Sequence, residues 1–188
     1  LDEDQVRAAA VTFRAQGVEA VAVCLLWSIV NPVHEERIRD ILAEEMPDVP
    51  VFLSSVVSPQ LREYPRFSTT ALCAALAGRL RDYVGRLESN LTEVGFHRAI
   101  RYIQCNGGTT SGAGLRERPV LALDSGPAAG PAAGRFFGRL FDTENVITLD
   151  MGGTSLDASL VHQGRIDTAK NVDVHRYRVA VPMVNVRT

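Results

Sequence analysis

Residues 146–157 read Val-Ile-Thr-Leu-Asp-Met-Gly-Gly-Thr-Ser-Leu-Asp, which is the most informative segment of the chain. A β-branched run ends on Asp150, turns through Gly152 and Gly153, and resumes as a second apolar run after Asp157. Two adjacent glycines between such runs predict a hairpin turn. Because glycine has no Cβ and tolerates positive φ, the backbone amides of this turn can close around a polyanion.

The side chains beside the glycines suit the same kind of ligand. Thr154 and Ser155 add hydroxyl donors. Asp150 and Asp157 supply carboxylates that can hold a hydrated divalent cation. The stretch therefore predicts a phosphate and metal clamp on a β-hairpin. On this motif alone, a turn in which the glycines serve only the backbone remains open.

The composition is typical of a globular protein and excludes several function classes. The chain has 188 residues, 46% of them hydrophobic and 22% charged, with a net charge of −2. The absence of a basic run or face argues against a nucleic-acid or membrane-surface partner. No apolar run reaches membrane-spanning length, and no signal-peptide pattern is present. Because the first residue is Leu1, we expect the chain to begin inside a larger protein.

The three cysteines are odd in number, widely spaced and placed in apolar stretches: Cys24, Cys73 and Cys105. This pattern predicts buried, inert thiols rather than a disulfide or zinc framework. It also indicates a reducing, cytoplasmic location.

The first 54 residues have the pattern of a strand–helix–strand unit. A helix is expected from its cap at Asp2 to Gly17, followed by a Val-rich strand over residues 18–26, buried on both faces. Asn31 and the proline after it predict the start of a second helix, and residues 49–54 a second strand. This order predicts parallel pairing with a right-handed crossover.

A long helix is predicted from Ser68 to Val94, because apolar residues recur there at helical spacing: Leu72, Leu76, Leu80, Val84, Leu87 and Leu91. Arg62, Glu63 and Arg66 precede it. They could form an active-site cluster, but the default interpretation of such residues is surface charge.

Two further strands are expected, over residues 99–105 and 119–124. The first delivers Asn106, Gly107 and Gly108 at its carboxyl end, which is the edge where open α/β sheets bind ligands. The same composition is also that of an ordinary loop.

A small-residue helix is expected from about residue 126, with glycines four residues apart: Gly126, Gly130, Gly134 and Gly138. Its nearly Cβ-free stripe allows close approach of another backbone, as between two lobes. Because Pro131 would break a helical hydrogen bond, this helix either begins near Gly130 or is kinked. We therefore expect residues 1–141 to be part of a first lobe, ending in this inter-lobe helix. Residues 142–188 are expected to start a second lobe, a β-meander with no helix to cover it.

Five segments in this order resemble the hydantoinase A/5-oxoprolinase family within the actin-like ATPases. They are residues 20–26 with 31–35, residues 62–64, residues 106–108, residues 125–130 and residues 150–157. The resemblance implies an α/β, ribonuclease-H-like actin-type ATPase fold, of which the chain holds parts of two lobes. It implies a protein that uses ATP and Mg²⁺ to phosphorylate a poorly electrophilic carbonyl, which then undergoes ring opening or carboxylation.

The resemblance also assigns roles to residues. Gly152, Gly153 and Thr154 would bind the β- and γ-phosphates of ATP, with Ser155 adding a hydroxyl. Asp150 would be the metal-holding and catalytic carboxylate, and Asp157 would support the loop. For Asn106, Gly107 and Gly108 it suggests contact with the substrate. The amino-terminal phosphate loop and the adenosine segment of the family are absent from residues 1–188, so we expect this chain alone to have negligible ATPase activity.

The motifs and the resemblance leave three functions open. The leading one is part of an ATP-dependent hydrolase of cyclic amides of the hydantoin or 5-oxoproline type. The second is a carboxylase subunit of the acetone or acetophenone type. The third, of a different class, is a non-catalytic actin-like module driven by ATP. Expected partners are a cyclic amide or ketone, the rest of the same subunit and a second, B-type subunit.

Overall fold

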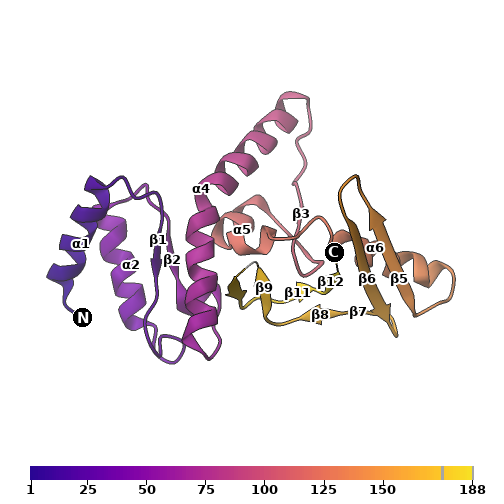
Figure 1. Cartoon of the computed structure of the whole chain (residues 1–188). Coiled ribbons are helices and arrows are strands. Elements are labelled where there is room, and N and C mark those ends of the chain that lie inside the picture. Colours follow the sequence, from indigo (N-terminus) through magenta and orange to yellow (C-terminus); the bar gives the residue numbers. More distant parts are fainter. Residues whose placement is uncertain (175, 188) are drawn as a thin grey trace. The chain divides into compact units, whose positions relative to one another are not determined.

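A computed structural model describes residues 1–174 and 176–187, which form two compact units (Figure 1). The first unit contains the described residues of segments 1–97, 116–120 and 173–180, and the second contains those of segments 98–115, 121–172 and 181–188. Both units thus combine segments that are distant in the sequence. The lobe boundary expected between residues 141 and 142 concerns the complete protein and stays a prediction.

The first unit is built mainly on helices around one short parallel strand pair. Its elements are α1 (Glu3–Ala15), β1 (Val21–Val23), α2 (Val33–Glu45), β2 (Val51–Leu53), α3 (Ser54–Val57), α4 (Glu63–Glu93) and β10 (Tyr177–Val179). The predicted capping of α1 is confirmed, since the Asp2 carboxylate accepts a hydrogen bond from the Gln5 amide at 3.1 Å. Gly17 follows the helix with a φ of +66°, the conformation that ends many helices.

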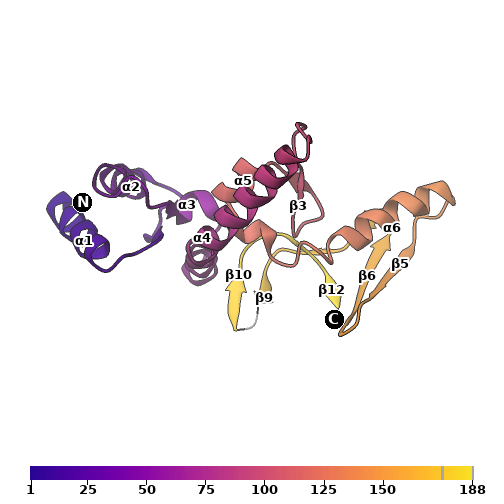
Figure 2. The ribbon, with the colours of Figure 1, turned by 90° about the horizontal axis from the view of Figure 1, so that it is seen from above.

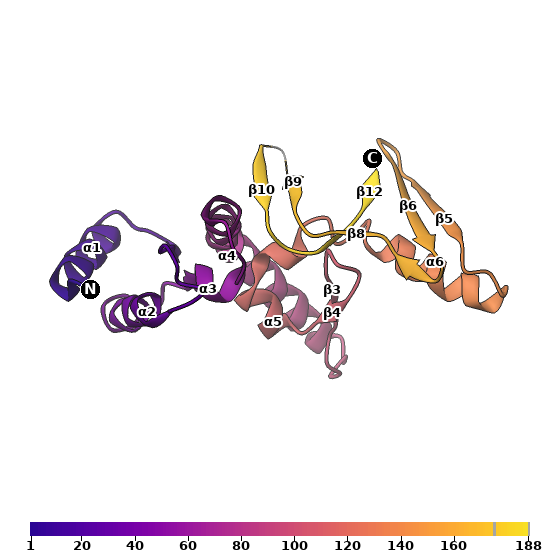
Figure 3. The same ribbon diagram turned by 90° about the horizontal axis from the view of Figure 1, so that it is seen from below.

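The predicted parallel strand–helix–strand unit is confirmed. β1 pairs with β2 in parallel, with Val21 opposite Val51 and Val23 opposite Leu53. Helices α1 and α2 lie side by side (Figure 3). The core between these helices and the strands consists of Ala10, Val23, Leu42, Met46 and Leu53.

The expected strand over residues 18–26 is wrong in its length. Only residues 21–23 form the strand, and Leu26 is 71% exposed. The chain leaves the strand direction through Trp27, whose φ is +57°. The second strand is also shorter than expected, because Ser54 already belongs to α3.

Helix α4 begins five residues earlier than predicted, and its buried stripe differs from the predicted leucine face. The buried residues are Arg66, Thr69, Thr70, Cys73, Ala77 and Val84. Apart from Arg66 these side chains are small, which lets the helix pack closely on β1, β2 and β10. The Thr69 hydroxyl accepts a hydrogen bond from the Ala180 amide at 2.8 Å. The predicted leucines, in contrast, are only half-buried.

The second unit consists mainly of short strands and the helix α6. Its elements are β3 (Tyr102–Ile103), β4 (Thr109–Thr110), α6 (Ala129–Leu140), β5 (Val146–Met151), β6 (Leu156–His162), β7 (Arg165–Ile166), β8 (Thr168–Ala169), β11 (Met183–Val184) and β12 (Val186–Arg187). Three elements span both units: α5 (Gly112–Glu117), the 3-10 helix η1 (Pro119–Ala122) and β9 (Val172–Val174), which pairs with β10.

The predicted hairpin over residues 146–162 is confirmed. β5 and β6 pair antiparallel along six residue pairs, from Val146 opposite Val161 to Met151 opposite Leu156. β6 also pairs with β7 and β12. Helix α6 lies along this hairpin (Figure 2).

The glycine stripe of α6 does permit a close approach, and the approaching element is β5 of the same unit. A Cβ added at Gly134 would overlap Thr148, and one at Gly138 would lie 2.7 Å from the Thr143 carbonyl oxygen. The helix begins at Ala129, so Pro131 falls in the first turn, where its missing N–H is tolerated. Of the two alternatives predicted for this helix, a start near Gly130 is therefore confirmed.

Two predicted strands are corrected. Residues 119–122 form a 3-10 helix instead of a strand. Residues 99–105 contribute only the two-residue β3, which pairs antiparallel with β4. The segment 106–108 is thus a hairpin turn rather than the carboxyl edge of a parallel sheet.

Candidate functional site

The turn that joins β5 and β6 is formed by residues 152–155. It is closed by a hydrogen bond from the Gly152 amide to the Ser155 carbonyl oxygen at 3.0 Å. All four residues of the turn are exposed. The turn is therefore open to a ligand and is not sealed beneath other side chains.

The two glycines of the turn do not adopt the left-handed backbone conformation that their sequence predicts. Neither Gly152 nor Gly153 has a positive φ, so the turn does not depend on the left-handed conformation. What both residues provide is space. A Cβ added at Gly153 would meet nothing within 4 Å, and one at Gly152 would meet only the Ser155 carbonyl oxygen at 3.9 Å. The backbone is thus bare on the side where a ligand can approach it.

The turn also carries hydrogen-bond donors that a ligand can use. In the part of the chain that the structure describes, the amides of Gly153 and Thr154 donate to no protein acceptor. The hydroxyls of Thr154 and Ser155 lie on the same exposed turn. Amides and hydroxyls gathered at one bend, with no Cβ in the way, are suited to binding phosphate oxygens.

Asp150 and Asp157 lie directly opposite each other, one residue pair before the end of the ladder. Asp150 is exposed and Asp157 is half-buried. Like charges directly opposite on paired strands destabilise a sheet, and a bound cation would remove that repulsion. Magnesium is commonly held by one or two carboxylates together with water and phosphate oxygens, so this pair fits it. No group of three or more acidic, histidine or cysteine side chains suited to a metal occurs among the described residues.

The predicted substrate residues Asn106, Gly107 and Gly108 form the β3–β4 turn. The Asn106 side-chain oxygen accepts the Gly108 amide at 2.8 Å, and Gly107 has a φ of +77°. A Cβ on Gly107 would lie 3.5 Å from a Val184 methyl and 3.6 Å from the Ala128 carbonyl oxygen. These contacts give the turn a packing role. Contact with a substrate stays a prediction.

Sequence reasoning missed a buried polar cluster in the first unit. The Glu35 side chain is fully buried, and its carboxylate accepts four hydrogen bonds. One oxygen accepts the Leu25 amide at 2.9 Å and the Ser54 hydroxyl at 2.6 Å. The other accepts the amide and the hydroxyl of Ser55 at 2.9 and 2.7 Å. Burial acts to raise the pKa of Glu35, but these hydrogen bonds outweigh it, so the pKa lies below its ordinary value.

Arg66 completes this cluster, and its interpretation as surface charge is wrong. Its guanidinium is fully buried and donates to the Ser54 hydroxyl at 3.2 Å, to the Leu25 carbonyl at 3.0 Å and to the Gln60 carbonyl at 3.1 Å. Leu25 and Ser54 follow β1 and β2, so the cluster fixes the chain at the carboxyl ends of both parallel strands. Arginine and glutamate are almost never fully buried unless they are paired, and sequence alone could not show the pairing.

The cysteine prediction is largely confirmed. All three thiols are free; Cys73 and Cys105 are buried and Cys24 is half-buried. Burial raises the pKa of Cys24 and of Cys73 to about 11. The described residues contain no helix that is long and apolar enough to cross a membrane.

The fold and the open glycine turn are those of an α/β protein of the actin-like class, and comparison with solved structures agrees. The chain superposes in full on the crystal structure of ATP-dependent caprolactamase from Pseudomonas jessenii with a TM-score of 0.91 and 44% identity. It also superposes on the nucleotide-free structure of acetone carboxylase, with a TM-score of 0.81 and 30% identity. It covers 27% of each of those chains.

The chain belongs to the hydantoinase/oxoprolinase family: the family profile matches residues 66–188, and the profile of the family's N-terminal region matches residues 1–46. Caprolactamase subunit alpha of P. jessenii is 44% identical over all 188 residues. Acetophenone carboxylase gamma subunit of Aromatoleum aromaticum is 34% identical over 88% of this chain, and 5-oxoprolinase of Saccharomyces cerevisiae is 31% identical over the same share. The chain spans 27%, 23% and 13% of the lengths of these three relatives.

Proposed function

We propose that the protein containing this chain is an ATP-dependent hydrolase of cyclic amides. The open β5–β6 turn carries this proposal, since it presents free amides beside two facing carboxylates. Support also comes from the relatives that are named as a caprolactamase and as 5-oxoprolinases. The carbonyl of a cyclic amide is a poor electrophile because of resonance. Transfer of the γ-phosphoryl group to its oxygen supplies a leaving group before water opens the ring.

In this proposal the chain's residues position and neutralise the phosphates. Gly153 and Thr154 donate their amides to phosphate oxygens, Gly152 keeps the approach free, and the hydroxyls of Thr154 and Ser155 add donors. Asp150 is the carboxylate nearest to the turn on β5, and Asp157 faces it from β6. Bound Mg²⁺ would neutralise charge on the phosphates, held by Asp150 with support from Asp157.

The substrate side of the site is assigned to the β3–β4 turn. Asn106, Gly107 and Gly108 are assigned to the substrate only through the family resemblance. Because acetone and acetophenone carboxylase subunits are also relatives, a ketone carboxylase is the second candidate. In that case the phosphorylated species would be an enolate oxygen, and carbon dioxide would replace water as the reaction partner.

Partner contacts are proposed for the apolar faces of the second unit. On β5 the side chains of Ile147, Leu149 and Met151 are between 67% and 80% exposed. On α6, Phe136 and Phe137 are more than half exposed. Large apolar side chains gathered in exposed positions are typical of surfaces that contact other protein. We assign them to the rest of the same subunit and to a second, B-type subunit, as the subunit names of the relatives suggest. Free thiols in all three cysteines support a cytoplasmic location.

The test uses the complete subunit with its partner, assayed for ADP release in the presence of hydantoin, 5-oxoproline, caprolactam, or acetone with bicarbonate. One cyclic amide should stimulate ATP hydrolysis and be opened. Asp150→Asn should lower kcat by about 100-fold or more, the loss typical for a group that stabilises transition-state charge. Asp48→Asn, at an exposed aspartate far along the chain, should leave kcat unchanged. Full activity of the Asp150→Asn protein would remove this carboxylate from the mechanism. ATP use with acetone alone would favour the carboxylase.

A further inference from the structure

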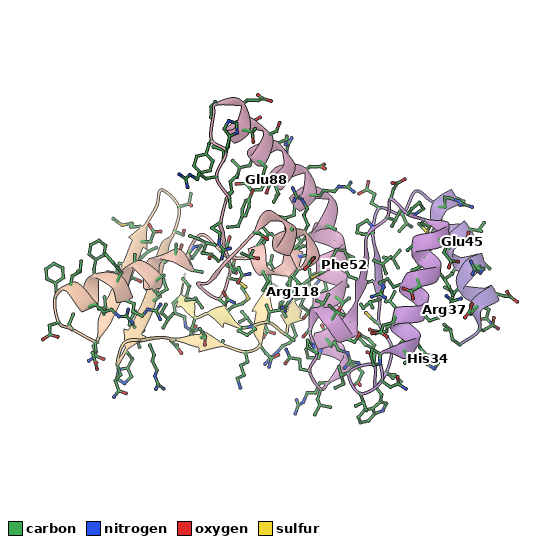
Figure 4. The ribbon with its side chains drawn as sticks, turned by 180° about the vertical axis from the view of Figure 1, so that it is seen from behind. His34, Arg37, Glu45, Phe52, Glu88 and Arg118 are labelled. Carbon is green, nitrogen blue, oxygen red and sulfur yellow. The ribbon has the colours of Figure 1, made fainter. Side chains whose placement is uncertain are left out.

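The first unit contains a hollow of about 450 Å³ beside β2, which we call the β2 hollow. Its lining includes the apolar residues Pro50, Phe52 and Val56 and the arginines Arg39, Arg116 and Arg118. Figure 4 labels Phe52 and Arg118, two residues of this lining. The volume is within the range of small-molecule sites.

One arginine of the hollow is left without a carboxylate. Among the described residues, the lining holds three guanidinium groups and the carboxylate of Glu117. Arg116 is paired with Glu88 at 2.7 Å, and Arg39 with Asp40 at 2.9 Å. Arg118 has no carboxylate partner among the described residues.

Arg118 is also incompletely hydrogen-bonded. One of its five N–H groups is used by the Val57 carbonyl oxygen, at 3.0 Å. Its Nε is enclosed by protein and has no acceptor among the described residues. The enclosed Nε is out of reach of a ligand. The donors that an oxyanion in the hollow can use are therefore the N–H groups on the two terminal nitrogens of Arg118, of which one is occupied by Val57.

The hollow also follows the unpaired edge of a strand. Within the described residues β2 pairs with β1 only, and residues 50–53 of the β2 segment line the hollow. The side chains that β2 contributes to the lining, those of Val51, Phe52 and Leu53, are apolar. An occupant that suits both these side chains and Arg118 has a charged end and an apolar body.

From these observations we propose that the β2 hollow binds a small organic oxyanion, a carboxylate or a phosphate ester. Its charged end pairs with Arg118, and its aliphatic body lies against Phe52 and Val56. This site is separate in sequence from the glycine turn, and its occupation does not depend on the proposed reaction.

The experiment is isothermal titration of the complete subunit without ATP, using octanoate and octyl phosphate as probes. Octanol and octylammonium serve as neutral and cationic probes of the same chain length. Octanoate, octyl phosphate or both should bind, at least tenfold more tightly than octanol, while octylammonium should not bind. Which of the two anions binds more tightly identifies the preferred headgroup. Equal binding of octanol and both anions, or no binding of either anion, would overturn the proposal.

Single substitutions test which residues of the β2 hollow bind the anion. Arg118→Gln should weaken binding of the anion by about tenfold or more, because a charge-assisted hydrogen bond is worth about 1.5 to 3 kcal/mol. Glu117→Gln leaves Arg118 in place and removes a negative charge from the lining of the hollow, so it should tighten binding about twofold to threefold. Val56→Glu, which adds a negative charge at an exposed position of the lining, should weaken it. Arg79→Gln changes an exposed arginine that does not line the β2 hollow and is the matched control. Anion binding unchanged by Glu117→Gln and Val56→Glu would refute the site even if Arg118→Gln misfolds.

Discussion

Replacing Glu35 by glutamine should loosen the carboxyl ends of β1 and β2. The carboxylate accepts the backbone amides of Leu25 and Ser55 on different oxygens. A glutamine side chain has only one acceptor atom, so one of these two buried amides would face an NH₂ group. Serine hydroxyls can rotate to become acceptors, but a backbone N–H cannot.

The size of the effect follows from these contacts. An unsatisfied buried amide costs about 1 to 3 kcal/mol, and breaking a buried ionic cluster costs about 3 to 5 kcal/mol. Because Ser54 lies between Glu35 and Arg66, the two effects overlap, and we expect a total of about 3 kcal/mol. Hydrogen exchange of the Leu25 and Ser55 amides should then become about 100-fold faster, at 1.4 kcal/mol for each factor of ten.

Hydrogen exchange with mass spectrometry on the complete subunit measures this locally, through peptides that cover residues 24–30 and 51–58. The matched control is Glu36→Gln, at the neighbouring exposed glutamate of α2. Exchange in those peptides should change less than about twofold in the control, as expected for an exposed charge near a helix terminus. If Glu35→Gln changes exchange no more than Glu36→Gln does, the cluster does not hold the strand ends together.

Three further results are expected. In thermal unfolding, Gly138→Ala should destabilise the protein by about 1 to 2 kcal/mol, because the added Cβ would lie 2.7 Å from a carbonyl oxygen. Gly85→Ala is the comparison: its added Cβ meets nothing within 4 Å, so this substitution should stabilise the protein by about 0.5 to 1 kcal/mol. The stability that the ionised Glu35 side chain provides should be complete above its unfolded pKa of about 4.5 and should be lost as the pH falls through its lower folded pKa. In the Glu35→Gln protein, acid unfolding should lack this pH-dependent loss of stability. The thiol pKa values of Cys24 and Cys73 are about 11, so both cysteines should react with iodoacetamide at pH 8 about 100-fold more slowly in the folded protein than in denaturant. Similar reaction rates in the folded and the denatured protein would contradict the burial of these thiols.

The elements that local chemistry determines could be predicted from the sequence. The cap of α1, the parallel pairing of β1 and β2, and the hairpin of β5 and β6 depend on caps, apolar runs and turn residues, all of which are visible in one chain. The helix start at Ala129 was one of two open alternatives, since Pro131 is tolerated only in a first turn.

The elements that depend on distant partners were missed. Residues 119–122 are apolar and read as a strand, but they form a 3-10 helix. The burial of Glu35 and Arg66 depends on hydrogen bonds to distant segments, such as Ser55, 20 residues from Glu35, and Leu25, 41 residues from Arg66. A local pattern contains no information on such contacts. In the candidate site the open turn was foreseen, but its backbone conformation was not, since neither glycine of the turn has a positive φ.

The most direct test is the affinity of the complete subunit for Mg-ATP after Gly153→Ala, measured by isothermal titration. The added methyl group meets no protein atom within 4 Å, so folding should be unaffected. We predict that Mg-ATP binds at least about tenfold more weakly, because the methyl group occupies the space through which a phosphate reaches the turn's amides. An unchanged Kd, with the melting temperature of the wild type, would show that the turn does not hold the nucleotide.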